Sequence, residues 1–147
     1  MALQGAIPVE FGMVFPHGVY AAGGFDKVRD FDKSKGDRVV QQADKASGLP
    51  LWVVEVIDAD PEARQRTVKV KVAAEYQPVL PSPTPGSPFT AVEFEGMTAM
   101  PYVDTGRCHA KDTGKCGARQ AYSFKATGVR VPSRAMPRPA AEHKDAA

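Results

Sequence analysis

The sequence predicts an all-β protein. Thirteen glycines and thirteen prolines are spread along the 147 residues and interrupt nearly every run long enough to form a helix. The runs between them are short and rich in valine and aromatic residues, which is typical of strands separated by turns. Six to seven short antiparallel strands of this kind indicate a small open or closed barrel. A barrel resembling the OB type is the expected architecture.

The chain is expected to hold one β-barrel-like domain over residues 1–131, followed by a disordered tail at 132–147. Its mass of 15.8 kDa suits a single core, and the tail has no apolar periodicity. The N-terminus lacks the pattern of a secretory signal, and no apolar run approaches the roughly 20 residues that span a bilayer. We therefore expect a cytoplasmic protein without membrane contact.

Two strands near the middle of the chain are predicted most clearly. Residues 49–57 are β-branched and aromatic, as in a buried strand. Residues 66–76 alternate apolar and charged side chains, so three valines share one face and two lysines the other. The short connection predicts an antiparallel pair. Six residues of this pair are expected in the core: Trp52, Val54, Val56, Val68, Val70 and Val72.

The remaining elements are expected to be shorter. Residues 5–22 predict two strands and a tight turn rather than a helix, and residues 23–48 predict a long loop around one strand at 38–42. A single helical turn is expected within 58–64, because Asp60 precedes a proline. Residues 78–88 hold five prolines and predict an extended connector. Further strands are expected at 89–95, 98–103 and 119–127.

Positive charge is concentrated late in the chain. Residues 104–131 hold six Lys/Arg and two Asp/Glu, whereas residues 1–63 hold six and ten. A stripe of cations beside aromatic residues is how small barrels hold nucleic acid, although Tyr122 and Phe124 are expected to fill the core. The candidate nucleic-acid-binding residues are Lys69, Lys71, Arg119 and Lys125 on strands, with Arg107 and Lys115 in the intervening loop.

The sequence supplies no recognisable catalytic or cofactor site. Cys108, His109 and Cys116 share one loop, but structural zinc wants four ligands, usually as two close pairs. Neighbouring residues of an extended chain point apart, which argues against Cys108 and His109 as a nucleophile and its base. A disulfide across the loop is geometrically plausible, and two thiols are expected in the cytoplasm. We expect no enzyme, metal or cofactor.

Several segments, in order, carry a family resemblance that covers roughly residues 4–131. They are IPVEF at 7–11 with VFPHG at 14–18, DK at 44–45 with GL at 48–49 and LW at 51–52, DADPEAR at 58–64, TVKVKV at 67–72, PF at 88–89 with VEF at 92–94, MPYVD at 100–104 and AYSFKATG at 121–128. The chain resembles the plasmid replication, integration and excision activators of actinomycete integrative and conjugative elements. Many members have a shorter turn where this chain has the Cys108–Cys116 loop.

The resemblance implies an accessory regulator encoded beside a replication initiator, an excisionase and an integrase. The leading expectation is therefore a DNA-associated activator that binds DNA, either single-stranded on an OB-like face or as a duplex near its operon. The alternative is a β-sheet adaptor that binds the initiator or a helicase without touching DNA. A third alternative is a β domain whose only partners are its own copies. A steep loss of binding affinity as salt rises would distinguish the DNA-binding activator from the other two alternatives.

Overall fold

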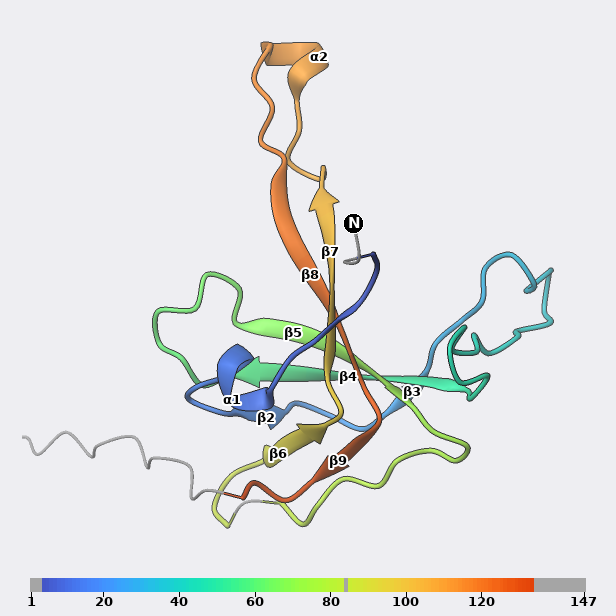
Figure 1. Cartoon of the computed structure of the whole chain (residues 1–147), viewed down its shortest axis with the longest axis vertical. Helices are drawn as coiled ribbons and strands as arrows, with labels where there is room; N and C mark the ends of the chain where they lie inside the picture. Colours follow the sequence, from blue (N-terminus) through green and yellow to red (C-terminus); the bar gives the residue numbers. More distant parts are fainter. Residues whose placement is uncertain (1–3, 84, 134–147) are drawn as a thin grey trace, which may run out of the picture.

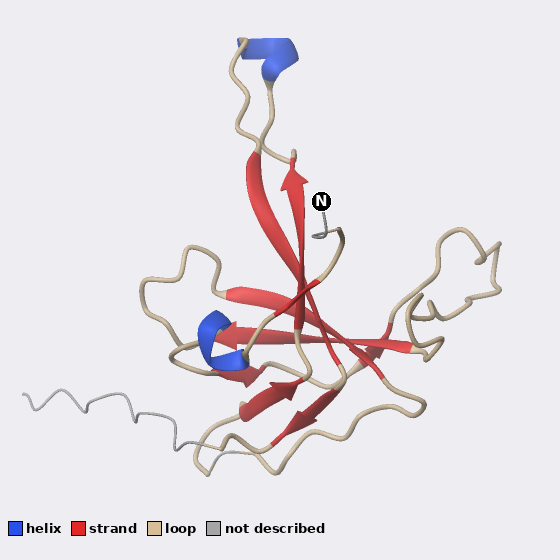
Figure 2. Cartoon of the chain, viewed as in Figure 1, coloured by secondary structure: helices blue, strands red, loops and turns tan. Residues whose placement is uncertain are grey.

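The computed structural model describes residues 4–83 and 85–133 of the chain. Strands dominate these residues, and helix is limited to two single turns (Figure 2). The all-β prediction is therefore confirmed. The elements, in chain order, are β1 (Ile7–Pro8), α1 (Phe11–Val14), β2 (Val19–Ala21), β3 (Asp26–Lys27), β4 (Leu51–Asp58), β5 (Thr67–Ala73), β6 (Thr90–Glu95), β7 (Thr98–Asp104), α2 (Ala110–Thr113), β8 (Arg119–Ala126) and β9 (Gly128–Arg130).

The strands form one sheet that curls into a half-barrel (Figure 1). Its order is β1-β7-β8-β5-β4-β2-β6-β9, and β3 pairs with β4 beside β2. The β4–β5 pair is antiparallel as predicted, with Val54 opposite Val70. One pair, β5 with β8, is parallel, which differs from the expected antiparallel arrangement. A parallel pair needs a long connection, and residues 74–118 provide it.

Four strands belong to one bent ribbon. The antiparallel pairs β6–β9 and β7–β8 follow one another along the same two chain segments, and the bend lies at Gly96 and Thr127. Gly96 has φ 59°, and a side chain there would collide with the hydroxyl of Thr127. Since β6 pairs with β2 while β8 pairs with β5, the two halves of the ribbon flank opposite ends of the curled sheet and link them covalently.

The core lies on the concave side of the sheet. Five of the six predicted core residues are buried, and Val68 is partly buried against them. The side chain of Trp52 donates a hydrogen bond from Nε1 to the carbonyl oxygen of Ala74 at 3.0 Å. Six valines from four strands form the centre of the core: Val19, Val54, Val56, Val70, Val72 and Val92.

The N-terminal segment is not the predicted strand hairpin. Its second element is the helical turn α1, while β1 pairs with β7 and β2 pairs with β4 and β6. A single turn forms because Phe11, Val14 and Phe15 then lie on one side. The Phe11 ring lies 5.6 Å from that of Phe15 and 6.4 Å from that of Phe94, and the Phe15 ring lies 5.9 Å from that of Phe124. This aromatic chain connects β6 to β8 across the half-barrel.

The connections differ from the sequence-based expectations in two places. Residues 58–64 form a hydrogen-bonded turn instead of a helical one, in which the Asp60 carboxylate accepts the backbone N–H of Glu62 at 2.9 Å. Residues 38–42 form isolated bridges, and the short strand of this loop is β3. The proline-rich connector forms no strand in its described residues, 78–83 and 85–88.

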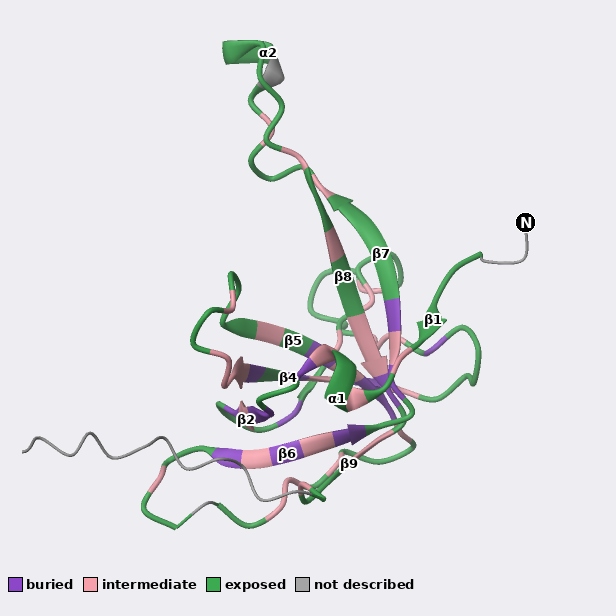
Figure 3. Ribbon diagram, turned by 60° about the vertical axis from the view of Figure 1, so that its left-hand side comes forward, coloured by how far each residue is buried: buried purple, intermediate pink, exposed green. Residues whose placement is uncertain are grey.

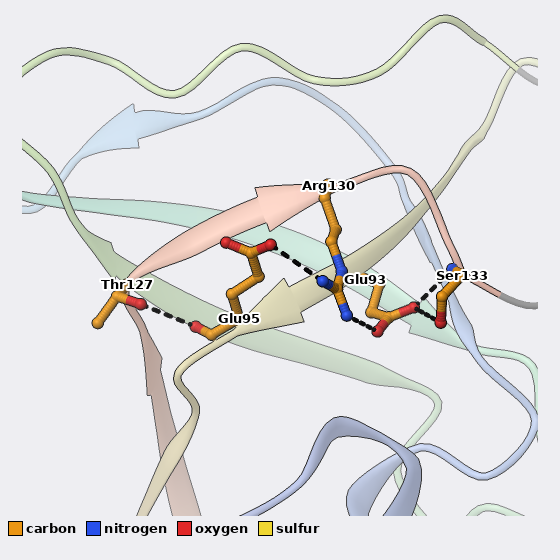
Figure 4. Close-up of polar contacts among 5 residues, drawn as sticks. All are labelled: Glu93, Glu95, Thr127, Arg130 and Ser133. Carbon is orange, nitrogen blue, oxygen red and sulfur yellow. Dashed lines mark hydrogen bonds and ion pairs between the residues drawn. The ribbon is translucent and has the colours of Figure 1, made fainter.

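The end of the described chain packs on β6. Ser133 donates two hydrogen bonds to one oxygen of Glu93, from its backbone N–H at 2.8 Å and from its hydroxyl at 2.9 Å (Figure 4). The described residues therefore include two beyond the expected boundary at 131, Pro132 and Ser133. The other residues of the expected tail, 134–147, lie outside the described residues. Neither helix in the described part of the chain has the length and apolar character needed to cross a membrane.

Candidate nucleic-acid interface

The outer half of the β7–β8 ribbon, with residues 105–118 and α2 at its end, projects away from the half-barrel (Figure 1). We call residues 100–123 the arm. Most of the arm is exposed on both sides (Figure 3). The exposed fractions are 49% for Tyr102, 66% for Val103 and 50% for Tyr122. The arm therefore offers exposed surface on both of its sides to a partner.

The lysines of β5 and β8 lie on the convex side of the sheet. Lys71 is directly opposite Lys125 in the parallel pair, and Lys69 lies two positions before Lys71 on the same face. Tyr102 is on this side too, because its ribbon partner is Ala121, four positions from Lys125. The structure thus places four of the candidate cations and one aromatic side chain on one side of the sheet: Lys69, Lys71, Arg119, Lys125 and Tyr102.

Lys125 is already engaged within the protein. Its Nζ lies 2.6 Å from Oδ1 of Asp44, whose side chain is only 9% exposed, while that of Lys125 is 32% exposed. The hydrogen bond from Lys125, followed by those from Ser47, lowers the pKa of Asp44 from 3.8 to about 2, against the opposing effect of burial. Because a buried carboxylate needs this partner, Lys125 belongs to the structure of the domain and is a poor candidate for contacting phosphate.

The two β5 lysines have different neighbours. Lys69 is opposite Glu55 on β4, whereas Lys71 is opposite Val53. A carboxylate across the strand attracts Lys69 and reduces the local positive potential. Lys71 therefore has no carboxylate opposite it on β4, but its side chain is half-buried whereas that of Lys69 is exposed.

Arg119 is paired at the start of β8. Its Nε lies 3.5 Å from Oδ2 of Asp104, the residue opposite it on β7. The backbone N–H of Gly106 is the main cause that lowers the pKa of Asp104, and Arg119 adds to it. Both side chains remain well exposed, so this exposed pair is weak and the guanidinium stays within reach of a ligand.

Positive charge is concentrated at the arm tip, where Arg107 lies close enough to Asp104 to help lower the pKa of that carboxyl. Residues 105–118 contain Arg107, Lys111 and Lys115 against one acidic residue, Asp112. In the described part of the chain, no ion pair involves these three cations. Lys111 was not among the sequence candidates, although its four-residue spacing from Arg107 and from Lys115 marks it as part of the same group.

The two aromatic residues of β8 differ in position. Phe124 packs against the core and contacts Phe15, as predicted. The prediction that Tyr122 fills the core is wrong: it is half exposed, and its hydroxyl accepts a hydrogen bond from Nε2 of Gln120 at 3.0 Å. The reason is that the ribbon has left the half-barrel by that point, which strict alternation along a strand does not reveal.

The groove between α1 and β6 has the opposite electrostatic character. Its polar lining consists mainly of Glu10, Glu93 and Glu95, with Arg130 as the only cation among its lining residues. Arg130 reaches Glu93 at 2.6 Å and Glu95 at 3.2 Å (Figure 4), and it is the main cause that lowers the pKa of Glu93. Phosphate would be repelled here, so this groove is not part of the nucleic-acid interface.

Within residues 4–83 and 85–133, no group of three His, Cys, Asp or Glu side chains is arranged to hold a metal ion. Comparisons of the chain with protein-family models, with curated proteins and with solved structures found no match.

Proposed function

We propose that the protein is an accessory factor that binds single-stranded DNA along its arm and the adjoining convex side of β5. The observation that carries the proposal is the arm, where Arg107, Lys111 and Lys115 outnumber the one acidic residue of the tip, Asp112, and where the exposed Tyr102 lies on the lysine side of the ribbon. Cations attract the phosphate backbone, and exposed aromatic rings stack on unpaired bases without reading their sequence. The combination suits a single strand.

The helices support this choice of ligand. Each has four residues, which is too short for a recognition helix lying in the major groove of duplex DNA. The strand would run from the arm tip past Tyr102 towards Lys71, on the side of the sheet that these residues share. In this arrangement Lys125 and Arg119 keep their carboxylate partners and shape the surface.

The family resemblance of the sequence supports the biological setting. An accessory DNA-binding regulator that activates replication, integration and excision of an integrative plasmid would act in the cytoplasm beside the initiator, helicase, integrase and excisionase. We propose this role for the chain.

The test compares two variants in which the net charge of the protein changes by the same amount. In the arm variant, Lys71→Gln, Arg107→Gln and Lys115→Gln are combined. In the control, Lys27→Gln, Lys33→Gln and Lys35→Gln are combined, because these exposed lysines lie in the segment before β4. Fluorescence anisotropy with a labelled oligonucleotide gives the affinity at several salt concentrations. Each lost phosphate contact should flatten the slope of log K against log salt by about 0.7.

We expect the arm variant to bind weakly and with a shallow slope, while the control matches the parent protein. Circular dichroism should show both variants folded, since exposed charge changes usually cost less than about 0.5 kcal/mol. A folded arm variant with the parent's affinity and salt slope would contradict the proposal.

One observation favours the adaptor alternative. Met100 and Val103 are exposed on opposite sides of the arm, with exposed fractions of 41% and 66%, and apolar side chains in such positions suit a protein partner. The adaptor would bind the initiator or helicase with little dependence on salt, and Val103→Ser would lower its affinity for that partner.

Light scattering of the protein alone tests the alternative of self-association through the β1 and β9 edges of the sheet.

A further inference from the structure

The two cysteines face one another within the arm tip, residues 105–118. Cys108 and Cys116 are partners in an isolated antiparallel bridge within residues 105–118, beyond the ends of β7 and β8, and both are thiols. Next to this bridge, Gly117 approaches the carbonyl oxygen of Arg107 so closely that no side chain would fit at position 117. The two backbone segments are therefore in tight contact beside the thiols.

This geometry suits a disulfide. Partners in an antiparallel bridge have Cα atoms about 4.5–5.5 Å apart, which is within the range of about 4.4–6.8 Å that a disulfide spans. Their side chains lie on the same face with Cβ atoms about 4.5–5.5 Å apart, and a disulfide brings them to about 3.5–4.5 Å. Closure therefore needs a movement of about 1 Å at the end of a loop.

We propose that Cys108 and Cys116 form a dithiol site that glutathione disulfide, or a similar small anionic disulfide, oxidises to an internal disulfide. Cys116 is exposed and Cys108 partly buried, so Cys116 is the thiol that the oxidant reaches first. Arg107 and Lys115 are the sequence neighbours of the two cysteines. Their positive charge draws an anionic oxidant to the site.

The reaction balances in two exchange steps. The thiolate of Cys116 attacks one sulfur of glutathione disulfide, the S–S bond breaks, and one glutathione thiolate leaves. The thiolate of Cys108 then attacks the Cys116 sulfur in the mixed disulfide, forms the Cys108–Cys116 bond and releases the second glutathione. Two electrons pass from the cysteines to the oxidant, and the two thiol protons pass through solvent to the released glutathiones.

The bond would enclose residues 109–115, which include α2, and would fix the spacing of Arg107 and Lys115. The site goes beyond the proposed DNA binding and does not depend on it, since its formation is measured without nucleic acid. Failure of one proposal therefore leaves the other standing.

The test uses the full-length protein, reduced and then freed of reductant. It is incubated with glutathione disulfide, alkylated, and measured by intact mass and thiol titration. We expect the loss of both thiols, a mass lower by two hydrogens and no retained glutathione. Trypsin cleaves after Arg107, Lys111, Lys115 and Arg119, so the digest should contain peptides 108–111 and 116–119 joined to each other until reductant is added.

The single variants Cys108→Ser and Cys116→Ser are the controls. Each lacks the second thiol, so each should retain one glutathione under the conditions that close the parent protein. Parent protein that carries two glutathiones, remains fully reduced, or links two chains together instead of closing internally would overturn the proposal.

Discussion

The ammonium group of Lys125 and the carboxylate of Asp44 form a 2.6 Å ion pair between residues 81 positions apart in the chain. Asp44 lies in the turn before β4, where its other carboxylate oxygen accepts hydrogen bonds from the backbone and hydroxyl of Ser47. Lys125 lies near the end of β8. The pair therefore fastens the long loop of residues 23–48 to the C-terminal ribbon.

This pair predicts a loss of stability in acid. The pKa of Asp44 is about 2 in the folded protein and 3.8 as its ordinary value. Because the pKa of Asp44 is lower in the folded protein than its ordinary value, the charged carboxylate stabilises the fold at every pH above about 4. This stabilisation is lost as the pH falls from about 4 to about 2 and the carboxylate is protonated. We expect Asp44→Asn to lower the free energy of unfolding by about 1–2 kcal/mol at pH 7, a figure reduced because Lys125 is partly exposed.

Urea unfolding of the parent and the Asp44→Asn variant between pH 7 and pH 2 checks this. The difference between the two should stay constant down to about pH 5 and shrink towards pH 2. Asp32→Asn is the control, because Asp32 is exposed and its side chain is in no ion pair of the described chain. A difference that did not change with pH would show that Asp44 contributes through shape alone.

Phe15 should be among the most sensitive positions of the core. Its ring is buried and contacts both Phe11 and Phe124. We expect Phe15→Ala to cost about 3–5 kcal/mol, because the cavity removes contacts on both sides of the half-barrel. Phe31→Ala is the matched control, since Phe31 is exposed and contacts Arg29, and it should cost less than about 1 kcal/mol. Equal unfolding midpoints for the two variants would refute the role of Phe15.

The bend of the ribbon should tolerate only glycine. Gly96 has a positive φ and faces the hydroxyl of Thr127 without room for a side chain, so Gly96→Ala combines backbone strain with a collision. We expect a loss of about 1–3 kcal/mol in chemical denaturation. Gly23→Ala introduces the same methyl group where nothing lies within 4 Å, and it should be nearly neutral. The opposite ranking would mean that the bend is not fixed at Gly96.

Two truncated chains should distinguish the contribution of residues 132–133 to stability from that of residues 134–147. A chain ending at Ser133 should unfold at the parent's temperature, because residues 134–147 have no apolar periodicity. A chain ending at Val131 also loses the two hydrogen bonds from Ser133 to Glu93, and its midpoint should fall by a few degrees. Differential scanning calorimetry distinguishes the three lengths, and a large drop for the chain ending at Ser133 would contradict the expectation.

The parts of the fold that the sequence predicted depend on local patterns. Alternation along residues 67–72 assigns Val70 and Val72 to the core and the lysines between them to the other face, and the short connection makes β4 and β5 neighbours. Both inferences need only the period of a strand and the length of a turn. The all-β class follows in the same way from the distribution of glycine and proline.

The parts that could not be predicted depend on distant partners. The helical turn at α1 is stabilised because the rings of Phe11 and Phe15, at this turn, pack against Phe94 and Phe124. Likewise, β9 exists because the bend at Gly96 brings it beside β6. No local sequence pattern predicts these aromatic contacts or the pairing of β9 with β6.

The same limit applies to the candidate interface. Alternation placed Lys71 and Lys125 on outward faces, and the β5–β8 register makes them neighbours. The sequence gives no sign that Asp44 neutralises Lys125, because the two meet only through the fold. It also did not show that the ribbon leaves the half-barrel before Tyr122, which is why that side chain was assigned to the core.

The bent ribbon also determines when the protein can fold during its synthesis. Before the ribbon emerges from the ribosome, β2, β4 and β5 can form at most a small sheet whose two outer strands lack their partners β6 and β8. Exposed strand edges of this kind invite pairing with other chains. Because β8 ends at Ala126 and β9 at Arg130, the half-barrel cannot close until nearly all of its strands have been synthesised, and nascent chains are most exposed to aggregation just before that point.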